Sequence, residues 1–114
     1  MTEIYKGTGW SREYVGYCEN GDIYEGSGWS KTLVGSYTDD GEIYEGTGWS
    51  RSIIGCFDSS EVYRGHGFFR TTVGAYKRGD IYEGTGWSKT CIGEYEGYEG
   101  GAAAAALLLL FKNK

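Results

Sequence analysis

The chain has 114 residues, a formal net charge of −5 at pH 7 and an aromatic content of 17%. This length is that of a single domain, and so many aromatic residues are not typical of a collagen-like or disordered chain. Because a protein that follows the phosphates of a nucleic acid needs a basic face, the negative charge argues against a nucleic-acid partner.

The first hundred residues repeat one motif five times. Each copy begins with an acidic residue, a β-branched residue and a tyrosine. A Gly-x-Gly segment, an aromatic residue and a basic residue then follow in that order. That aromatic residue recurs at spacings of 19, 20, 19 and 19, at Trp10, Trp29, Trp49, Phe68 and Trp87. The second half of each copy ends on a β-branched residue, glycine, any residue and an aromatic residue. Val15-Gly16-Tyr17 in the first copy is one residue shorter. The copies occupy approximately residues 3–21, 22–41, 42–60, 61–79 and 80–100.

Each copy is predicted to form a β-hairpin, because Val, Ile, Tyr and Trp favour strands. The first strand contains the Ile-Tyr-Glu segment and is expected to continue to the tryptophan. Gly21, Gly41 and Gly79 supply the positive φ of the turns between copies. One hairpin cannot bury its own apolar face, and closing five into a ring removes most free strand edges. The predicted fold class is therefore all-β, with five hairpin repeats of about 19 residues closed into a pseudo-five-fold ring.

Residues 101–114 form a second segment of different composition. Ala102 to Phe111 is a run of ten apolar residues, and alanine and leucine have the highest helix propensities. We expect a short C-terminal helix, packed in or near the ring and plugging its axis, because it is apolar on every side. Association with a second copy, or insertion into a membrane surface or a partner, are the alternatives.

The Gly-x-Ile-Tyr-x-Gly-x-Gly and Val-Gly-x-Tyr segments, followed by the tail from Gly100 to Leu110, resemble the bacterial β-flower proteins. In that family short hairpins surround a pseudo-symmetric axis, and this chain differs by having longer hairpins and five of them. The resemblance implies a fold and no established activity. Tyr24-Glu25-Gly26 with Trp29 is also similar to MORN repeats, and Thr47-Gly48-Trp49 to choline- and cell-wall-binding repeats.

No catalytic motif, metal site or cofactor site is predicted. His66 is the only histidine. The three cysteines, Cys18, Cys56 and Cys91, lie at different positions of their copies, and we expect each of them to be a small buried apolar residue. The cysteines are few and odd in number, which favours a reduced protein. Without a secretory signal at the start, and without an apolar run of ~20 residues, we expect a cytoplasmic protein that has no transmembrane span.

Two sets of charges recur once in each copy. A closed ring turns them into an acidic and a basic circle, which we interpret as a solvated rim with weak ion pairs between neighbouring copies. Cation binding by the acidic circle and anion binding by the basic circle are the alternatives. The acidic set is Glu3, Asp22, Glu42, Glu61 and Asp80, and the basic set is Arg12, Lys31, Arg51, Arg70 and Lys89.

The repeated aromatic residues are the candidate binding residues. In one interpretation they form shallow pockets between copies, where their aromatic faces bind sugars or quaternary ammonium groups. In the other they fill the hairpin interfaces as part of the core. Packing is the favoured interpretation, since Phe68 replaces tryptophan in one copy. The candidates are Trp10, Trp29, Trp49, Phe68 and Trp87, with Tyr5, Tyr24, Tyr44, Tyr63 and Tyr82.

These observations favour a small, non-enzymatic structural or protein-interaction module of bacterial type, which binds a protein partner or itself. The alternative is a ligand-binding module with repeated Trp/Tyr pockets for a glycan or a quaternary ammonium group. Partial exposure of the tryptophans, seen as quenchable fluorescence that shifts with a ligand, favours the second, and fully buried indoles exclude it.

Overall fold

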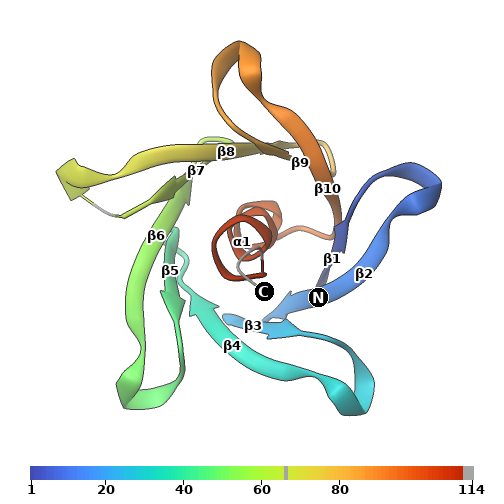
Figure 1. Ribbon diagram of the computed structural model, residues 1–114. Helices are drawn as coiled ribbons and strands as arrows, with labels where there is room; N and C mark the ends of the chain where they lie inside the picture. The colour runs from blue at the N-terminus through green and yellow to red at the C-terminus, as the bar shows by residue number, and fades with distance from the viewer. Residues whose placement is uncertain (66, 112–114) are drawn as a thin grey trace.

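The computed structural model describes residues 1–65 and 67–111, in which ten antiparallel strands close into a barrel around a C-terminal helix (Figure 1). Every strand pairs with its neighbours in the chain, and β1 closes the barrel by pairing with β10. The molecule is a disc of 39 × 37 × 25 Å. The strands are β1 (Thr2–Lys6), β2 (Glu13–Glu19), β3 (Asp22–Glu25), β4 (Thr32–Tyr37), β5 (Glu42–Glu45), β6 (Ser52–Asp58), β7 (Glu61–Arg64), β8 (Thr71–Lys77), β9 (Asp80–Glu83) and β10 (Thr90–Glu96).

The strands form hairpins that share one register. In each hairpin the β-branched residue of the first strand lies opposite the glycine of the second, and a bulge follows this pair. The β-branched side chains face the axis and are fully buried, since alternate residues of a strand point to opposite faces. They are Ile4, Ile23, Ile43, Val62 and Ile81.

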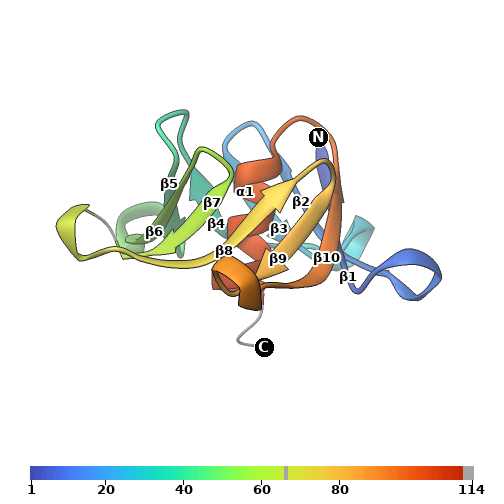
Figure 2. The same ribbon diagram turned by 90° about the horizontal axis from the view of Figure 1, so that it is seen from above.

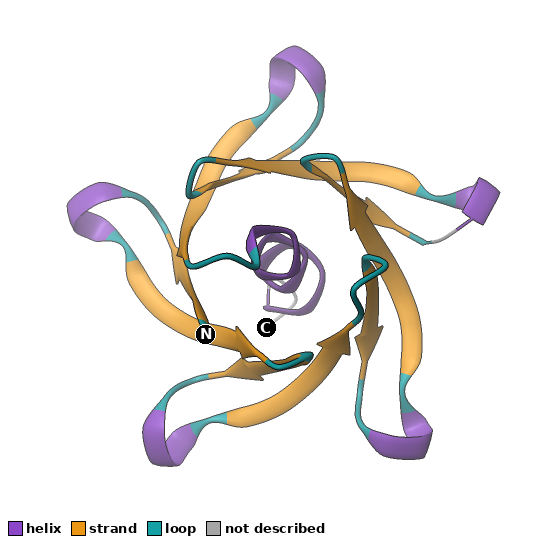
Figure 3. Ribbon diagram, turned by 180° about the vertical axis from the view of Figure 1, so that it is seen from behind, coloured by secondary structure: helices purple, strands orange, loops and turns teal. Residues whose placement is uncertain are grey.

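The outer ends of the hairpins are short 3-10 turns, which project away from the central helix (Figure 3). The expectation that the first strand continues to the tryptophan is wrong. Positive φ at Gly7 (85°) and Gly9 (59°) ends the extended backbone before Trp10, and the other hairpins repeat this. The turns are η1 (Gly9–Ser11), η2 (Gly28–Ser30), η3 (Gly48–Ser50), η4 (Gly67–Phe69) and η5 (Gly86–Ser88).

The C-terminal helix lies inside the barrel, as the tail composition predicts (Figure 2). It begins as α1 (Gly100–Ala105) and continues as the π-helix η6 (Ala106–Phe111), and every residue of both segments is buried. The predicted domain boundary between residues 100 and 101 falls one residue inside this helix. Residues 112–114 of the predicted tail, and His66, lie outside the described residues.

The last five residues of η6, Leu107 to Phe111, face different hairpins. Each lies against the glycine of one return strand, where an added Cβ would collide with both the helix and the backbone of the next hairpin. A π-helix bonds residue i to i+5, so its wider turn directs about five successive side chains around one circle. The pairs are Leu107 with Gly93, Leu108 with Gly74, Leu109 with Gly55, Leu110 with Gly35, and Phe111 with Gly16.

The first hairpin keeps the common register, so the interpretation of Val15-Gly16-Tyr17 as a shortened copy is wrong. Ile4 pairs with Gly16 as Ile23 pairs with Gly35. Cys18, not Tyr17, then occupies the inward position that the other hairpins give to an aromatic residue. Tyr17 instead faces outward and stacks on Tyr24 with ring centroids 4.8 Å apart.

The turns between hairpins confirm the positive φ predicted at Gly21, Gly41 and Gly79, where φ is 89°, 92° and 90°. The third connection lacks a glycine, and Ser59 and Ser60 adopt φ of 51° and 77° there. Among the described residues, no helix has the length and apolar character required to cross a membrane.

Candidate binding surface

Each of the 3-10 turns, which we call the tips, carries a large and fully exposed aromatic side chain. The interpretation that the tip aromatic residues fill the hairpin interfaces is wrong, because these turns extend beyond the barrel wall. Their relative exposures reach those of isolated side chains, at 106% for Trp10, 105% for Trp29, 103% for Trp49, 101% for Phe68 and 105% for Trp87. Phe69 adds a second exposed ring at the fourth tip.

The candidate tyrosines lie on the outer wall of the barrel and are partly buried. The basic residue of the same hairpin covers each tyrosine ring at a cation–π distance. The structure therefore separates the ten candidate residues into exposed tip rings and covered wall rings. The distances to the ring centroids are 3.8 Å for Arg12 on Tyr5, 5.0 Å for Lys31 on Tyr24, 4.6 Å for Arg51 on Tyr44, 4.0 Å for Arg70 on Tyr63 and 5.3 Å for Lys89 on Tyr82.

In three hairpins the acidic residue accepts a hydrogen bond from the same tyrosine. The hydroxyl of Tyr44 donates to Glu42 Oε1 at 3.0 Å, and this hydrogen bond raises the pKa of Tyr44. Tyr5 donates to Glu3 at 3.0 Å and Tyr63 to Glu61 at 2.8 Å in the same way. In these three hairpins a carboxylate, a phenol and a cation of the same hairpin therefore form a row on the outer wall.

An ion pair joins the first and last hairpins, but its carboxylates, Glu94 and Glu96, lie outside the acidic set for which ion pairs between copies were predicted. Arg12 Nη1 donates to Glu94 Oε1 at 2.8 Å, and Nη2 donates to Glu96 Oε2 at 2.7 Å. The backbone N–H of Gly9 also donates to Glu94, at 3.2 Å. These contacts, with that of Arg12 first, hold the pKa of the Glu94 carboxyl below its usual value.

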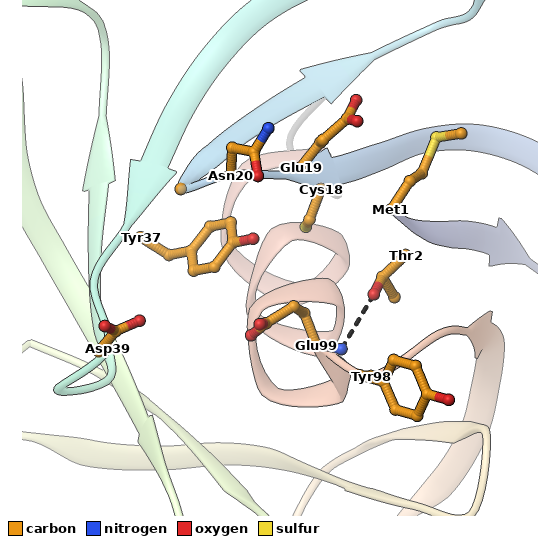
Figure 4. Close-up of a pocket in the computed structure, with 10 residues that line it drawn as sticks. Met1, Thr2, Cys18, Glu19, Asn20, Tyr37, Asp39, Tyr98 and Glu99 are labelled. Atoms are coloured by element: carbon orange, nitrogen blue, oxygen red, sulfur yellow. Dashed lines mark hydrogen bonds between the residues drawn. The ribbon is translucent and has the colours of Figure 1, made fainter.

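A cavity of about 460 Å³ opens at the end of the barrel where α1 begins (Figure 4). Cys18 and Tyr37 line it from the wall, and Glu99 lines it from the start of the helix. The Glu99 N–H donates to Thr2 Oγ1 at 2.9 Å. The other hairpins have an aromatic ring at the position of Cys18, so the smaller cysteine side chain leaves space for the cavity on the side of the first hairpin. Burial, with the negative charge of Glu99, raises the pKa of the Cys18 thiol to about 12.

The repeat pattern did not predict the Glu94 contact or the cavity, although the sequence contains a signal for each. Glu94 is the one carboxylate at the residue between the glycine and the final aromatic, and Cys18 is the one small residue at the aromatic position. The three cysteines are unpaired, and Cys18 is buried as expected whereas Cys56 and Cys91 are partly exposed. Within residues 1–65 and 67–111, no three His, Cys, Asp or Glu side chains group as metal ligands would.

Comparison with known proteins gave no family model, curated protein or solved structure that matches the chain. The candidate surface is therefore defined by its own chemistry, which consists of exposed aromatic tips above a wall of covered tyrosines.

Proposed function

We propose that the protein is a non-enzymatic interaction module whose aromatic tips contact a protein partner or a second copy. The full exposure of Trp10, Trp29, Trp49, Phe68 and Trp87 carries the proposal. Large aromatic rings kept in water add nothing to the core, whereas they supply most of the energy at interfaces. A rigid barrel with short projecting turns holds them ready for contact.

The proposal includes pseudo-five-fold symmetry, in which the hairpins are copies of one unit in a flower of the β-flower type. The common register and the repeated pairing of a β-branched residue with glycine support it. Symmetry matters for function because identical tips bind a repetitive partner together. Linked contacts raise the overall affinity well above that of any single tip.

Glycan binding is the second candidate function. The exposed indoles favour it, because an open aromatic face stacks on a sugar ring. A quaternary ammonium ligand is less well supported, since the wall tyrosines already carry the cations of their own hairpins, such as Arg12 at 3.8 Å from Tyr5.

The thiols support the non-enzymatic part of the proposal. A catalytic cysteine needs a lowered pKa, whereas burial raises the pKa of Cys18 and of Cys91. Unpaired cysteines also support the proposed cytoplasmic location, where thiols stay reduced.

The test replaces all five tip residues, Trp10, Trp29, Trp49, Phe68 and Trp87, with alanine. We expect an unchanged melting temperature and loss of binding in cross-linking from cell extract, in sedimentation for self-association, and on a glycan array. Single substitutions should weaken binding far less than the fivefold variant, as multivalent contact requires.

Tyr98→Ala is the matched control, because Tyr98 is 103% exposed but lies between β10 and α1 rather than on a tip. Binding that survives in the five-tip variant, or that Tyr98→Ala removes equally, contradicts the proposal. Binding to the glycan array alone would favour the second candidate.

A further inference from the structure

The outer wall of the barrel has a groove between the second and third hairpins, beside the base of the third tip. The groove between the second and third hairpins is a hollow of about 90 Å³ lined by Ser36 on one side and by Gly48 and Arg51 on the other. A water molecule in the liquid takes about 30 Å³, so this hollow accepts a small group rather than a whole ligand.

We call the equivalent place between the fifth and first hairpins the filled groove, because a carboxylate lies there against the glycine N–H and the arginine. Glu94 pairs with Tyr5 across that junction, as Ser36 pairs with Tyr44 across the other. The Glu94 carboxylate accepts from the Gly9 N–H at 3.2 Å and from Arg12 at 2.8 Å. A carboxylate is therefore the group that this arrangement of a glycine N–H and an arginine binds within the protein itself.

The second groove has the donors without the carboxylate. Ser36 stands where the fifth hairpin has Glu94, and Thr38 stands where it has Glu96. Arg51 forms no ion pair with any described residue and only stacks on Tyr44, at 4.6 Å. The Ser36 hydroxyl oxygen is buried and has no hydrogen-bond partner among the described residues, which leaves a polar atom unsatisfied at the base of the groove.

We propose that the groove between the second and third hairpins binds a carboxylate, supplied by a glutamate side chain of an acidic segment in a partner protein. Arg51 pairs with the carboxylate, the Gly48 N–H donates to it as Gly9 does to Glu94, and the Ser36 hydroxyl donates a third hydrogen bond. Hydrogen bonds to charged groups are the stronger kind. That the carboxylate belongs to a protein rests on the proposed function, whereas the carboxylate site itself does not.

Asp22 also lines the groove and places a negative charge near the site. The filled groove answers this objection, because Asp80 holds the same position there, directly paired with Glu94. The Glu94 carboxyl nevertheless has a lowered pKa, because of its hydrogen bonds from Arg12 first and from the Gly9 N–H second.

The other junctions between hairpins differ from this one in the residues that lie beside the tip. Tyr17 stacks on Tyr24 at the junction of the first and second hairpins. Arg70 Nη1 lies 3.8 Å from Cys56 Sγ at the next junction after the proposed site. The groove before the fifth tip has Lys89 in place of arginine, which cannot form the forked pair with a carboxylate.

The experiment follows backbone and arginine side-chain NMR signals while the whole protein is titrated with a blocked Gly-Gly-Glu-Gly-Gly peptide. The matched ligand is the same peptide with glutamine. We expect saturable shifts of the Gly48 N–H and Arg51 Nε–H signals with the glutamate peptide only. Gly9 and Arg12 should not respond, because Glu94 occupies their groove.

Two variants sharpen the test. Arg51→Gln should weaken peptide binding at least about tenfold. Ser36→Glu should place a carboxylate in the groove, abolish peptide binding and shift the Gly48 N–H signal downfield toward that of Gly9 without any ligand. If the tip variants keep their partner, the proposed function is contradicted, whereas the NMR signals of Gly48 and Arg51 still test the carboxylate site independently.

Absence of any Gly48 shift, equal shifts with the glutamine peptide, or equal shifts at Gly9 would overturn the proposal. Glucuronate is the third ligand in the series. Binding of glucuronate without binding of the glutamate peptide would also overturn it, because the site would then select an acidic sugar rather than an acidic protein segment.

Discussion

The axis and the tips of this molecule contain apolar side chains in opposite surroundings. On the axis, Leu109 is 1% exposed and lies against Gly55. At a tip, Trp29 is 105% exposed, and an added Cβ on the neighbouring Gly28 would meet nothing within 4 Å. The axis is packed so closely that even a methyl group has no room, whereas the tips have no packing to disturb.

This difference indicates that the two regions do different work. The axis supplies the stability that ten short strands need, because it buries the inner face of every hairpin at once. The tips are then free to change residue without loss of the fold, as the replacement of tryptophan by Phe68 at the fourth tip illustrates. Function should therefore be sought on the outer wall and the tips.

Removal of the helix should have the largest effect. Burial of Leu107 to Phe111 contributes about 7–15 kcal/mol at ~1.5–3 kcal/mol per side chain, which is comparable to the whole stability of a small domain. A chain ended at Glu99 should show no cooperative melting by circular dichroism. A truncated chain that melts like the full-length protein would make the helix dispensable and break the comparison.

A methyl group on the axis should cost more than one at a tip. Gly74→Ala would push against Leu108 and the Tyr82 carbonyl oxygen, so we expect a loss of about 3 kcal/mol or more. Gly86→Ala has open space but a φ of 55°, so the loss should be about 1 kcal/mol. Urea unfolding measures both, and equal losses would contradict the difference between axis and tip.

The turn between the third and fourth hairpins offers a gain in stability. Ser60 has a φ of 77°, where the other turns have glycine at 89–92°. Ser60→Gly should raise the free energy of unfolding by about 0.5–1 kcal/mol. Ser30→Gly, at a residue without positive φ, is the control and should give no gain. A destabilised Ser60→Gly variant would show that the serine contributes more than its backbone strain costs.

The ion pair of the filled groove should have the smallest effect, because it is exposed. Arg12→Gln should lower the melting temperature at pH 7, and 1 M NaCl should reduce the difference. The pKa of Glu94 is lowered in the fold, so its contribution is present above its unfolded value near 4.5 and is lost as the pH falls through the lower folded value.

Arg51→Gln is the control for this prediction, since Arg51 also stacks on a tyrosine but forms no ion pair with a described residue. If the melting temperatures of Arg12→Gln and the wild type differ by as much at pH 2 as at pH 7, the role of Glu94 is contradicted.

Much of the fold could be predicted because it depends on local patterns. The period of about 19 residues predicted the hairpins, and the run from Ala102 to Phe111 predicted a helix that needs to be surrounded. The change to a π-helix at Ala106 could not be predicted in this way, because it depends on matching side chains to glycines of different hairpins.

The candidate site was predicted in composition but not in arrangement. Tyr44 and Trp49 belong to one repeat, yet the positive φ of Gly46 and Gly48 sends the indole out to the tip while the phenol stays on the wall under Arg51. Likewise, the spacing within a copy could not show that Glu94 meets Arg12, since these residues lie 82 positions apart.

By itself, the sequence determined the repeat, the hairpins, the glycines of their turns and the apolar helix, because propensity and periodicity act over a few neighbouring residues. Only the tertiary structure decided which aromatic rings are exposed, which tyrosines carry a cation, and which groove already holds a carboxylate. The physical reason is that closure of the barrel brings β1 beside β10 and sets each side chain on the inner or the outer face of the wall.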